Sequence, residues 1–372
     1  MTQCKKVRIG DYIEARNERN TDLRYDASLI EGVNNIGVFC KSRANTDGID
    51  LKPYKAVYKG DFAYNPSRLN IGSLALREGD MCIVSHLYVV FHLNELGQRL
   101  FLPEYLYIYF NREEFRRLIT VLNYGSQRPE FNIHEFSNLY IPLPSIDKQR
   151  EIVNVWKSLK SLKEQNERIS EPLMALCRSK IQELKNTLPL ISLAEHIEHN
   201  EERNENKYGL SSLRGISIEK KFIESKANME NVSLAPYLVI HPNDIAYVTI
   251  TSRNGEKISI AHNDSDENYI VSSSYEAFHV KDTSKLIPSY LFLMLTRSEF
   301  DRYARFNSWG SAREAFSWEE MKRVKIPIPS KEVQRAIVDI YQCAQRAKTI
   351  AAEADQQLKT ICPALIQYVV NN

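Results

Sequence analysis

Arg, Asn and Gln side chains in four glycine-containing stretches are the residues of this 372-residue chain best suited to contact a nucleic acid. Arg can pair with the edge of guanine, and Asn or Gln with the edge of adenine. Surface loops favour the same residue types for other reasons, so base contact is a hypothesis at this point. The stretches are YNPSRLNIGS at 64–73, YGSQRPEF at 124–131, TSRNGEK at 251–257 and WGSAREAF at 309–316. The candidate residues within them are Arg68, Asn70, Gln127, Arg128, Arg253, Asn254, Lys257 and Arg313.

Motifs that indicate catalysis or cofactor binding do not occur in the sequence. It has no G-x-G-x-x-G stretch, phosphate-binding loop or H-E-x-x-H pair. YNPS at 64–67 comes nearest to the D-P-P-Y-like segment of adenine methyltransferases but lacks the second proline. His196 and His199 would lie one turn apart on a helix and could bind a metal, yet their acidic, polar surroundings favour a solvated surface. The sequence therefore predicts no catalytic or metal site and no cofactor bound by this chain.

An internal duplication places the four stretches in two pairs. When the sequence is shifted by 185 residues, 13 of the 32 residues at 125–156 are identical to those at 310–341. Unrelated sequences would share roughly two. The most similar segments are IPLPSIDKQREIV from Ile141 and IPIPSKEVQRAIV from Ile326. Weaker similarity extends upstream with small shifts of register, so we predict a tandem repeat of two similar halves.

Composition and charge are those of an ordinary globular protein, with 43% hydrophobic and 26% charged residues. The net charge of +2 divides into +1 for 1–144, +3 for 145–186, −3 for 187–329 and +1 for 330–372. A protein that binds DNA alone is usually more basic, so either nucleic acid is not the ligand or a partner supplies much of the phosphate contact. No apolar run approaches 18 residues and the six cysteines are scattered, which predicts a cytoplasmic protein with reduced thiols.

Each half of the chain combines a globular part with a helical tail. Short runs rich in Tyr, Phe, Val and Ile, broken by Gly, Asn and Pro, predict strands in the globular parts. One helical stretch is expected in each of them, from Leu102 and from Ile287, so the fold class is α+β. The predicted globular domains are 1–144 and 187–329, and the predicted helices that follow them are 145–186 and 330–372.

Both helical tails carry the alternating 3,4 spacing of apolar residues that is typical of a coiled-coil seam. Leucines on the first helix match alanines on the second, which predicts antiparallel pairing within the chain, with docking of each helix on its own domain as the alternative. Pro172 and Pro363 are expected to kink or end the helices. The unbroken part of the first helix would span roughly 36 Å, close to one turn of B-DNA. The predicted seam residues are Ile152, Val155, Leu159, Leu162, Ile169, Ile337, Ile340, Ala344, Ala347 and Leu358.

Along essentially its whole length the sequence resembles the specificity subunits of type I restriction–modification enzymes. The resemblance rests on YNPSRLNIGS, the two G-S-x-R stretches, the paired I-P-[LI]-P-S…QR-x-I-V helix starts and the duplicated plan of domain plus helix. It implies two target recognition domains separated by a two-helix antiparallel coiled coil, with pseudo-twofold symmetry. Each domain would read one half of a bipartite, asymmetric sequence in double-stranded DNA.

The resemblance also implies partner subunits. Two methyltransferase subunits would dock on the helices and carry S-adenosylmethionine, and a separate restriction subunit would use ATP and Mg²⁺. The chain itself would be a non-catalytic specificity subunit. Gln149, Arg150, Gln334 and Arg335 at the two helix starts are the candidate docking residues, although these side chains could instead bridge to their own domain.

Two other functions are compatible with the sequence. The chain could be a scaffold whose two domains bind two proteins, in which case no methyltransferase would co-purify with it. It could also be a stand-alone DNA-modifying enzyme with an unrecognised site, in which case the purified chain alone would be active.

Overall fold

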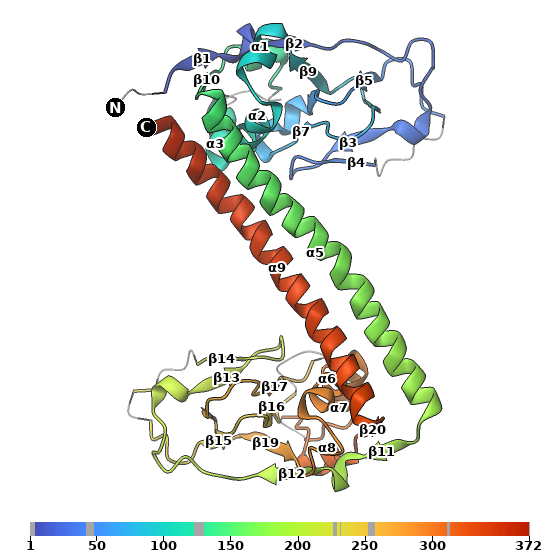
Figure 1. Cartoon of the computed structure of the whole chain (residues 1–372), viewed down its shortest axis with the longest axis vertical. Helices are drawn as coiled ribbons and strands as arrows, with labels where there is room; N and C mark the ends of the chain where they lie inside the picture. The colour runs from blue at the N-terminus through green and yellow to red at the C-terminus, as the bar shows by residue number, and fades with distance from the viewer. Residues whose placement is uncertain are drawn as a thin grey trace. The chain divides into compact units, whose positions relative to one another are not determined.

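The computed structural model describes residues 4–41, 48–122, 130–225, 229–230, 232–251, 257–310 and 313–371. The chain forms two compact units, residues 1–166 together with 350–372, and residues 167–349. Each unit contains a globular part and one portion of each of two long helices, α5 (Ile146–Thr187) and α9 (Lys331–Asn371), which Figure 1 shows in green and red.

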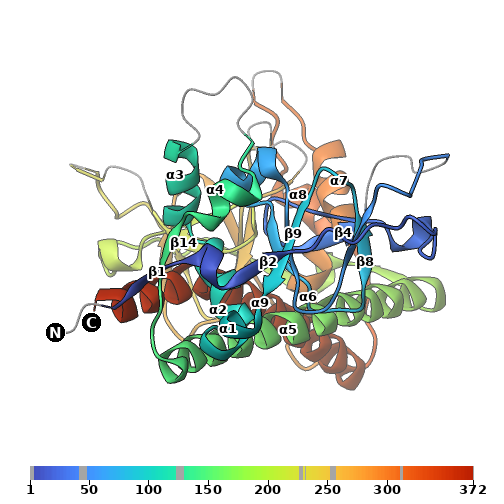
Figure 2. The same ribbon diagram turned by 90° about the horizontal axis from the view of Figure 1, so that it is seen from above.

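A four-stranded antiparallel sheet with the order β2-β9-β6-β7 forms the centre of the first unit. Figure 2 shows β9 beside β2. Three two-stranded antiparallel ladders, β1–β10, β3–β4 and β5–β8, complete the described sheet structure of this unit. The strands are β1 (Lys6–Arg8), β2 (Ile13–Ala15), β3 (Glu31–Val33), β4 (Phe39–Lys41), β5 (Lys55–Val57), β6 (Phe62–Tyr64), β7 (Leu74–Leu76), β8 (Cys82–Val84), β9 (Val89–Leu93) and β10 (Tyr140–Pro142).

The second unit repeats this arrangement strand for strand. Its central sheet has the order β12-β19-β16-β17, and its ladders are β11–β20, β13–β14 and β15–β18. The predicted α+β tandem repeat is therefore confirmed. The strands are β11 (Leu190–Ser192), β12 (Ile197–Asn200), β13 (Arg214–Ile216), β14 (Phe222–Glu224), β15 (Leu238–Ile240), β16 (Ile245–Val248), β17 (Ile260–His262), β18 (Tyr269–Val271), β19 (Tyr275–Val280) and β20 (Lys325–Pro327).

The single helix expected in each globular part is two helices. Asn111 ends the first of them because its side-chain amide donates hydrogen bonds to the carbonyls of Tyr107 and Leu74, and Thr296 occupies the corresponding position in the second unit. The α-helices are α1 (Glu95–Leu100), α2 (Pro103–Phe110), α3 (Glu113–Leu122), α4 (Ile133–Ser137), α6 (Pro288–Leu295), α7 (Ser298–Phe306) and α8 (Trp318–Arg323). Short 3-10 helices are η1 (Ile9–Asp11), η2 (Ala27–Leu29), η3 (Pro66–Ile71), η4 (Leu193–Glu195) and η5 (Leu210–Ser212).

The aromatic cores of the two units have matching geometry. The ring centroids of Tyr64 and Phe91 are 6.3 Å apart at an interplanar angle of 66°. Those of Tyr247 and Phe278 are 6.3 Å apart at 65°. All four side chains are fully buried, so the same edge-to-face contact anchors the central sheet in each unit.

The two long helices run antiparallel. In the first unit, the ammonium of Lys163 on α5 lies 2.6 Å from the carboxylate of Asp355 on α9. In the second unit, the thiol of Cys177 on α5 is 3.9 Å from the carbonyl oxygen of Ile337 on α9. Higher-numbered residues of α5 thus lie beside lower-numbered residues of α9. Neither Pro172 nor Pro363 ends its helix, contrary to expectation, because a proline removes only one backbone donor and the remaining turns stay bonded.

On α5 the buried face is shifted by one residue at every second position of the predicted seam. Ile152 is buried and Leu159 is half-buried, as predicted, but the buried side chains between and beyond them include Trp156 and Cys177. The other predicted seam residues are wrong, because they are exposed: Val155 by 37%, Leu162 by 43% and Ile169 by 49%.

On α9 the predicted seam residues do face inward. Ile337, Ala344 and Ala347 are buried, and Ile340 and Leu358 are half-buried against the cores of their units. The alanines leave room for close approach of the neighbouring helix. Among the described residues, no helix is long and apolar enough to cross a membrane.

Candidate nucleic-acid interface

The predicted loop at 64–73 in the first unit is built around the 3-10 helix η3. Asn65 caps its start, because the side-chain oxygen accepts a hydrogen bond of 3.0 Å from the backbone N–H of Ser67. Gly72 closes its end with φ +98°, a conformation that favours glycine. Arg68 on η3 is exposed and Asn70 is half-buried.

Gly72 also allows η3 to lie directly against α3. A Cβ atom at this position would lie 2.5 Å from the carbonyl oxygen of Asn35 and 2.6 Å from the guanidinium carbon of Arg116 on α3. The glycine is therefore required by both its backbone conformation and the space around it. This close contact fixes the height of Arg68 and Asn70 above α3.

The second predicted stretch of the first unit returns to the same place. Gln127 and Arg128 lie outside the described residues, but the chain that follows them is placed. The backbone N–H of Phe131 donates a hydrogen bond of 3.1 Å to the carbonyl of Pro66, the first residue of η3. Phe131 is itself buried in the core of the unit. The two predicted stretches thus meet at η3.

The two predicted stretches of the second unit meet in the same manner. Thr251 N–H donates to the carbonyl of Glu314 at 3.0 Å, and Phe316 N–H donates to the carbonyl of Thr249 at 2.8 Å. These bonds join the end of the β16 strand to the WGSAREAF stretch. Arg253 and Asn254 lie outside the described residues, whereas Lys257 and Arg313 are described and exposed beside this junction.

A buried charge under the junction differs between the units. In the second unit Asp301 of α7 accepts a hydrogen bond of 2.7 Å from the ammonium of Lys220. Burial lowers the pKa of Lys220 and the Asp301 partner opposes that effect. The residue equivalent to Asp301 by the 185-residue shift is Arg116. Its buried Nε has no hydrogen-bond partner within the described chain, so a positive group lies uncompensated under η3.

Sequence reasoning missed Arg116, which lies on a helix outside the four stretches. The signal that could have found it is the exchange of charge at equivalent positions of the two halves, arginine in one and aspartate in the other. The structure adds the reason that this exchange matters. Arg116 touches Gly72 and is therefore part of the support of η3.

The helix starts hold two of the four predicted docking residues in the interior, and for these two the prediction is wrong. Gln149 is fully buried, with its amide nitrogen bonded to the carbonyls of Leu100 and Pro144 at 2.8 and 3.0 Å and its oxygen to the N–H of Leu102 at 2.9 Å. Gln334 makes the same three bonds to Lys285, Pro329 and Ile287.

The two arginines of the same helix starts, Arg150 and Arg335, are exposed. A buried amide whose donors and acceptor are all bonded to its own domain has nothing left to offer a partner. Gln149 and Gln334 instead tie each long helix to the globular part that precedes it. Docking through these positions remains a possibility only for the arginines.

The histidines considered as a metal pair lie on a strand instead of a helix. His196 precedes β12 and His199 lies within it. The ring of His199 stacks on Trp318 at 4.9 Å and its Nδ1 lies 3.2 Å from the carboxylate of Glu201. No group of three His, Cys, Asp or Glu side chains suited to a metal ion occurs among the residues that the structure describes.

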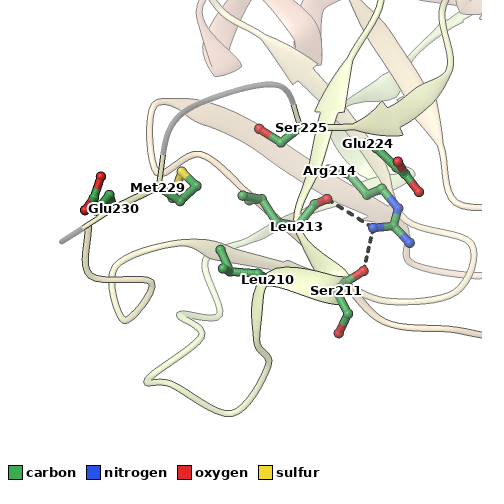
Figure 3. Close-up of a pocket in the computed structure, with 8 residues that line it drawn as sticks. All are labelled: Leu210, Ser211, Leu213, Arg214, Glu224, Ser225, Met229 and Glu230. Atoms are coloured by element: carbon green, nitrogen blue, oxygen red, sulfur yellow. Dashed lines mark hydrogen bonds between the residues drawn. The ribbon is translucent and has the colours of Figure 1, made fainter.

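A pocket of about 470 Å³ opens in the second unit beside the β13–β14 hairpin (Figure 3). The guanidinium of Arg214 at its edge donates to the carbonyls of Ser211 and Leu213 at 2.7 and 3.0 Å and lies over the ring of Tyr269. These contacts use Arg214 to hold the surrounding turn. None of the predicted site residues lines this pocket; its lining consists of Leu210, Ser211, Leu213, Arg214, Glu224, Ser225, Met229 and Glu230.

Comparisons with known proteins agree with this architecture. The family model described as type I restriction modification DNA specificity domain matches residues 1–173 and 200–360. The specificity subunit of the type I restriction enzyme HindI from Haemophilus influenzae is 25% identical over 156 residues, which are 41% of this chain and 33% of that subunit. The matched stretch thus spans about a third of that relative's length.

The crystal structure of the S subunit of a type I restriction-modification system from M. genitalium is similar in fold over nearly the whole chain. It has a TM-score of 0.60 and 16% sequence identity, with 98% of this chain and 95% of that chain covered.

Proposed function

We propose a function from the fact that this chain belongs to the family of type I restriction modification DNA specificity domains. It is the DNA sequence-recognition subunit of a type I restriction–modification complex. Its two globular parts read a bipartite, asymmetric target in double-stranded DNA. It binds no cofactor and performs no catalysis, while methyltransferase subunits supply S-adenosylmethionine and a restriction subunit supplies the chemistry that needs ATP and Mg²⁺.

The observation that carries this proposal is the meeting of two predicted stretches in each unit. In the first unit Phe131 is bonded to the start of η3, and in the second unit Thr249 and Thr251 are bonded to Phe316 and Glu314. Residues far apart in the sequence are thus held on one hydrogen-bonded support in each half. A pair of stretches presented together can contact several neighbouring base pairs, as reading a short half-site requires.

The exposed cations at these supports have two roles in the proposal. Arg68 and Arg313 contact base edges, while Lys257 and the partly buried Arg116 contact phosphate groups. An uncompensated guanidinium such as that of Arg116 is stabilised when a phosphate approaches it. Asn70 and four residues outside the described chain are further base-reading candidates of the proposal: Gln127, Arg128, Arg253 and Asn254.

Partner subunits dock on the long helices in this proposal. The exposed positions of α5 form a stripe with heptad spacing, Val155, Leu162, Ile169 and Leu176, exposed by 37–53%. An apolar stripe of this kind on a long helix is suited to packing against a helix of another protein. The near-neutral charge of the chain fits the same view, because a methyltransferase would share the phosphate contacts.

Two methyltransferase copies would not meet identical surfaces. The positions of α9 that correspond to the stripe are Ile340, Ala347, Ala354 and Ile361, and the two alanines are buried. The stripe is therefore not repeated on α9. We propose that exposed residues common to both helix starts, including Arg150 and Arg335, supply the shared part of the two docking surfaces, and that the stripe adds to one of them only.

Adenine methylation mapped across DNA tests the proposal directly. The chain is purified with and without the methyltransferase subunit encoded beside it, and each preparation is incubated with S-adenosylmethionine and genomic DNA. We expect methylation in an asymmetric bipartite motif from the complex and none from either protein alone. Methylation by the chain alone would favour a stand-alone enzyme, and failure of the two proteins to associate would favour a protein-binding scaffold.

A further inference from the structure

Two exposed aromatic side chains project beside the proposed recognition support of the second unit. Phe306 is the last residue of α7 and is 78% exposed, and Trp309 is 67% exposed. Large apolar side chains that are this exposed in a cluster mark an interaction surface more often than isolated ones do. The remaining question is what covers them.

The backbone beneath these rings is held firmly. Trp309 and Ala315 exchange two backbone hydrogen bonds of 3.0 and 3.1 Å, and the hydroxyl of Ser308 donates to the carbonyl of Ala304 at 2.6 Å. Gly310 follows with φ +142°, and a Cβ there would lie 2.3 Å from the carbonyl oxygen of Arg313. The tight pairing that this glycine permits keeps Trp309 at a fixed position on the surface.

The first unit has an apolar projection at the same place. Val121, near the end of α3, is equivalent to Phe306 by the 185-residue shift and is 70% exposed. Leu118 and Leu122 beside it are also exposed. Both units therefore present apolar side chains at the end of the helix that supports the recognition residues. The first unit uses aliphatic residues and the second uses aromatic ones.

The charges around the second pair favour a nucleic acid as the occupant. Lys257, Arg302, Arg305 and Arg313 are exposed in the same region, and of the nearby carboxylates Glu314 is paired with Arg305. Aromatic rings set among cations are the usual composition of surfaces that stack on bases while the cations contact phosphates. An apolar docking site for a protein helix would place leucines in a row instead, as α5 does.

We propose that Phe306 and Trp309 form an aromatic wedge that enters the DNA at the half-site read by the second unit and partly unstacks one base step. This inference rests on the proposed function and adds a contact that the four predicted stretches do not include. Apolar wedges of this kind open base steps in several classes of DNA-binding protein. In the first unit Val121 would make a shallower contact, so the two half-sites would be distorted to different extents.

Tryptophan fluorescence of the assembled complex tests the contact. Trp309 is much more exposed than Trp156, which is buried, and than Trp318, which is half-buried, so Trp309→Phe removes the emission that DNA would alter most. We expect cognate duplex to quench the emission of the wild-type complex and to leave the Trp309→Phe complex nearly unchanged. An equal response of both complexes to DNA would overturn the proposal.

Binding and base stacking are then compared in the variant Phe306→Ala/Trp309→Ala. We expect a loss of about tenfold or more in affinity for the cognate duplex, from the loss of base stacking. A 2-aminopurine placed in the second half-site, away from the methylated adenine, should brighten with wild-type complex and not with the variant. The matched control is Leu210→Ala, which removes an equally exposed apolar side chain of the same unit from η5 and should leave both measurements unchanged.

The outcomes separate the wedge from the function on which it rests. If the wild-type complex binds no DNA sequence selectively, the proposed function fails. If it does, but the double variant binds and brightens as wild type does, only the wedge fails. If adding methyltransferase alone shifts the Trp309 emission as DNA does, the rings belong to the protein interface and the wedge is likewise rejected.

Discussion

Single residues carry the connection between each globular part and its long helix. Because Gln149 satisfies three backbone groups in the interior, Gln149→Ala should leave them unpaired and lower the free energy of unfolding by about 1–3 kcal/mol. Chemical denaturation of the full chain measures this change. Arg150→Ala next to it removes only an exposed side chain and should change stability by less than about 0.5 kcal/mol. Equal effects of the two variants would contradict the role given to Gln149.

The guanidinium groups of the first unit should separate base reading from phosphate contact. Arg68→Ala should relax the target at one base position, with a cost of about 1–3 kcal/mol for the preferred base. Arg116→Met should weaken binding to all sequences alike and reduce the dependence of affinity on salt by about one phosphate contact. Titrations of the complex with duplex variants at several salt concentrations measure both effects.

The stability of the Arg116→Met variant is an internal control for this pair. Removing a buried cation that lacks a partner relieves a cost of burial, so the variant should be at least as stable as wild type. A marked loss of stability would show that Arg116 has a structural partner and would remove the reason for placing a phosphate beside it.

At the scale of the elements, the exposed stripe of α5 should decide methyltransferase docking. Leu162→Glu places a charge in the middle of the stripe and should abolish co-purification of the methyltransferase, because an unpaired carboxylate would be buried in the interface. Stability of the chain alone should hardly change, since Leu162 is exposed. Ser161→Glu, about 100° around the helix, is the matched control and should co-purify normally.

The phase of the helix pairing shows what the sequence could and could not predict about elements. The long helices, their antiparallel pairing and the inward-facing alanines of α9 follow from spacing alone. The phase of α5 does not, because its apolar residues occupy two overlapping heptad patterns. The larger pattern, with Val155, Leu162 and Ile169, is exposed, while the face with Trp156 and Cys177 is buried. A wide apolar face thus allows two seams, and only packing against the neighbouring helix chooses between them.

At the scale of the whole molecule, the duplication was visible in the sequence and the recognition supports were not. Identities at a constant offset predict two equivalent folds, since equivalent core residues such as Tyr64 and Tyr247 must pack alike. The convergence of separate stretches on η3 depends on backbone hydrogen bonds that no residue pattern specifies. The same holds for Arg116, which acquires its place only when α3 packs against η3.

Exchange of one globular part should change one half of the recognised motif. Residues 187–329 are replaced by the same region of a relative, and methylated adenines are mapped in cells that contain the matching methyltransferase. Because the base-reading residues of the first unit are retained, its half-site should persist while the other half changes. A change in both halves, or in neither, would mean that the two units do not read DNA independently.

The buried glutamines at the two helix starts have a consequence for how such genes diversify. Gln149 and Gln334 make the same set of three bonds at the same joint, within segments that are nearly identical in sequence. A genetic crossover inside these segments would connect either globular part to either helix while every bond of the joint is re-formed. The most similar peptides of the chain are therefore also its safest recombination points, and new target sequences can arise by shuffling intact halves without any step through an unstable protein.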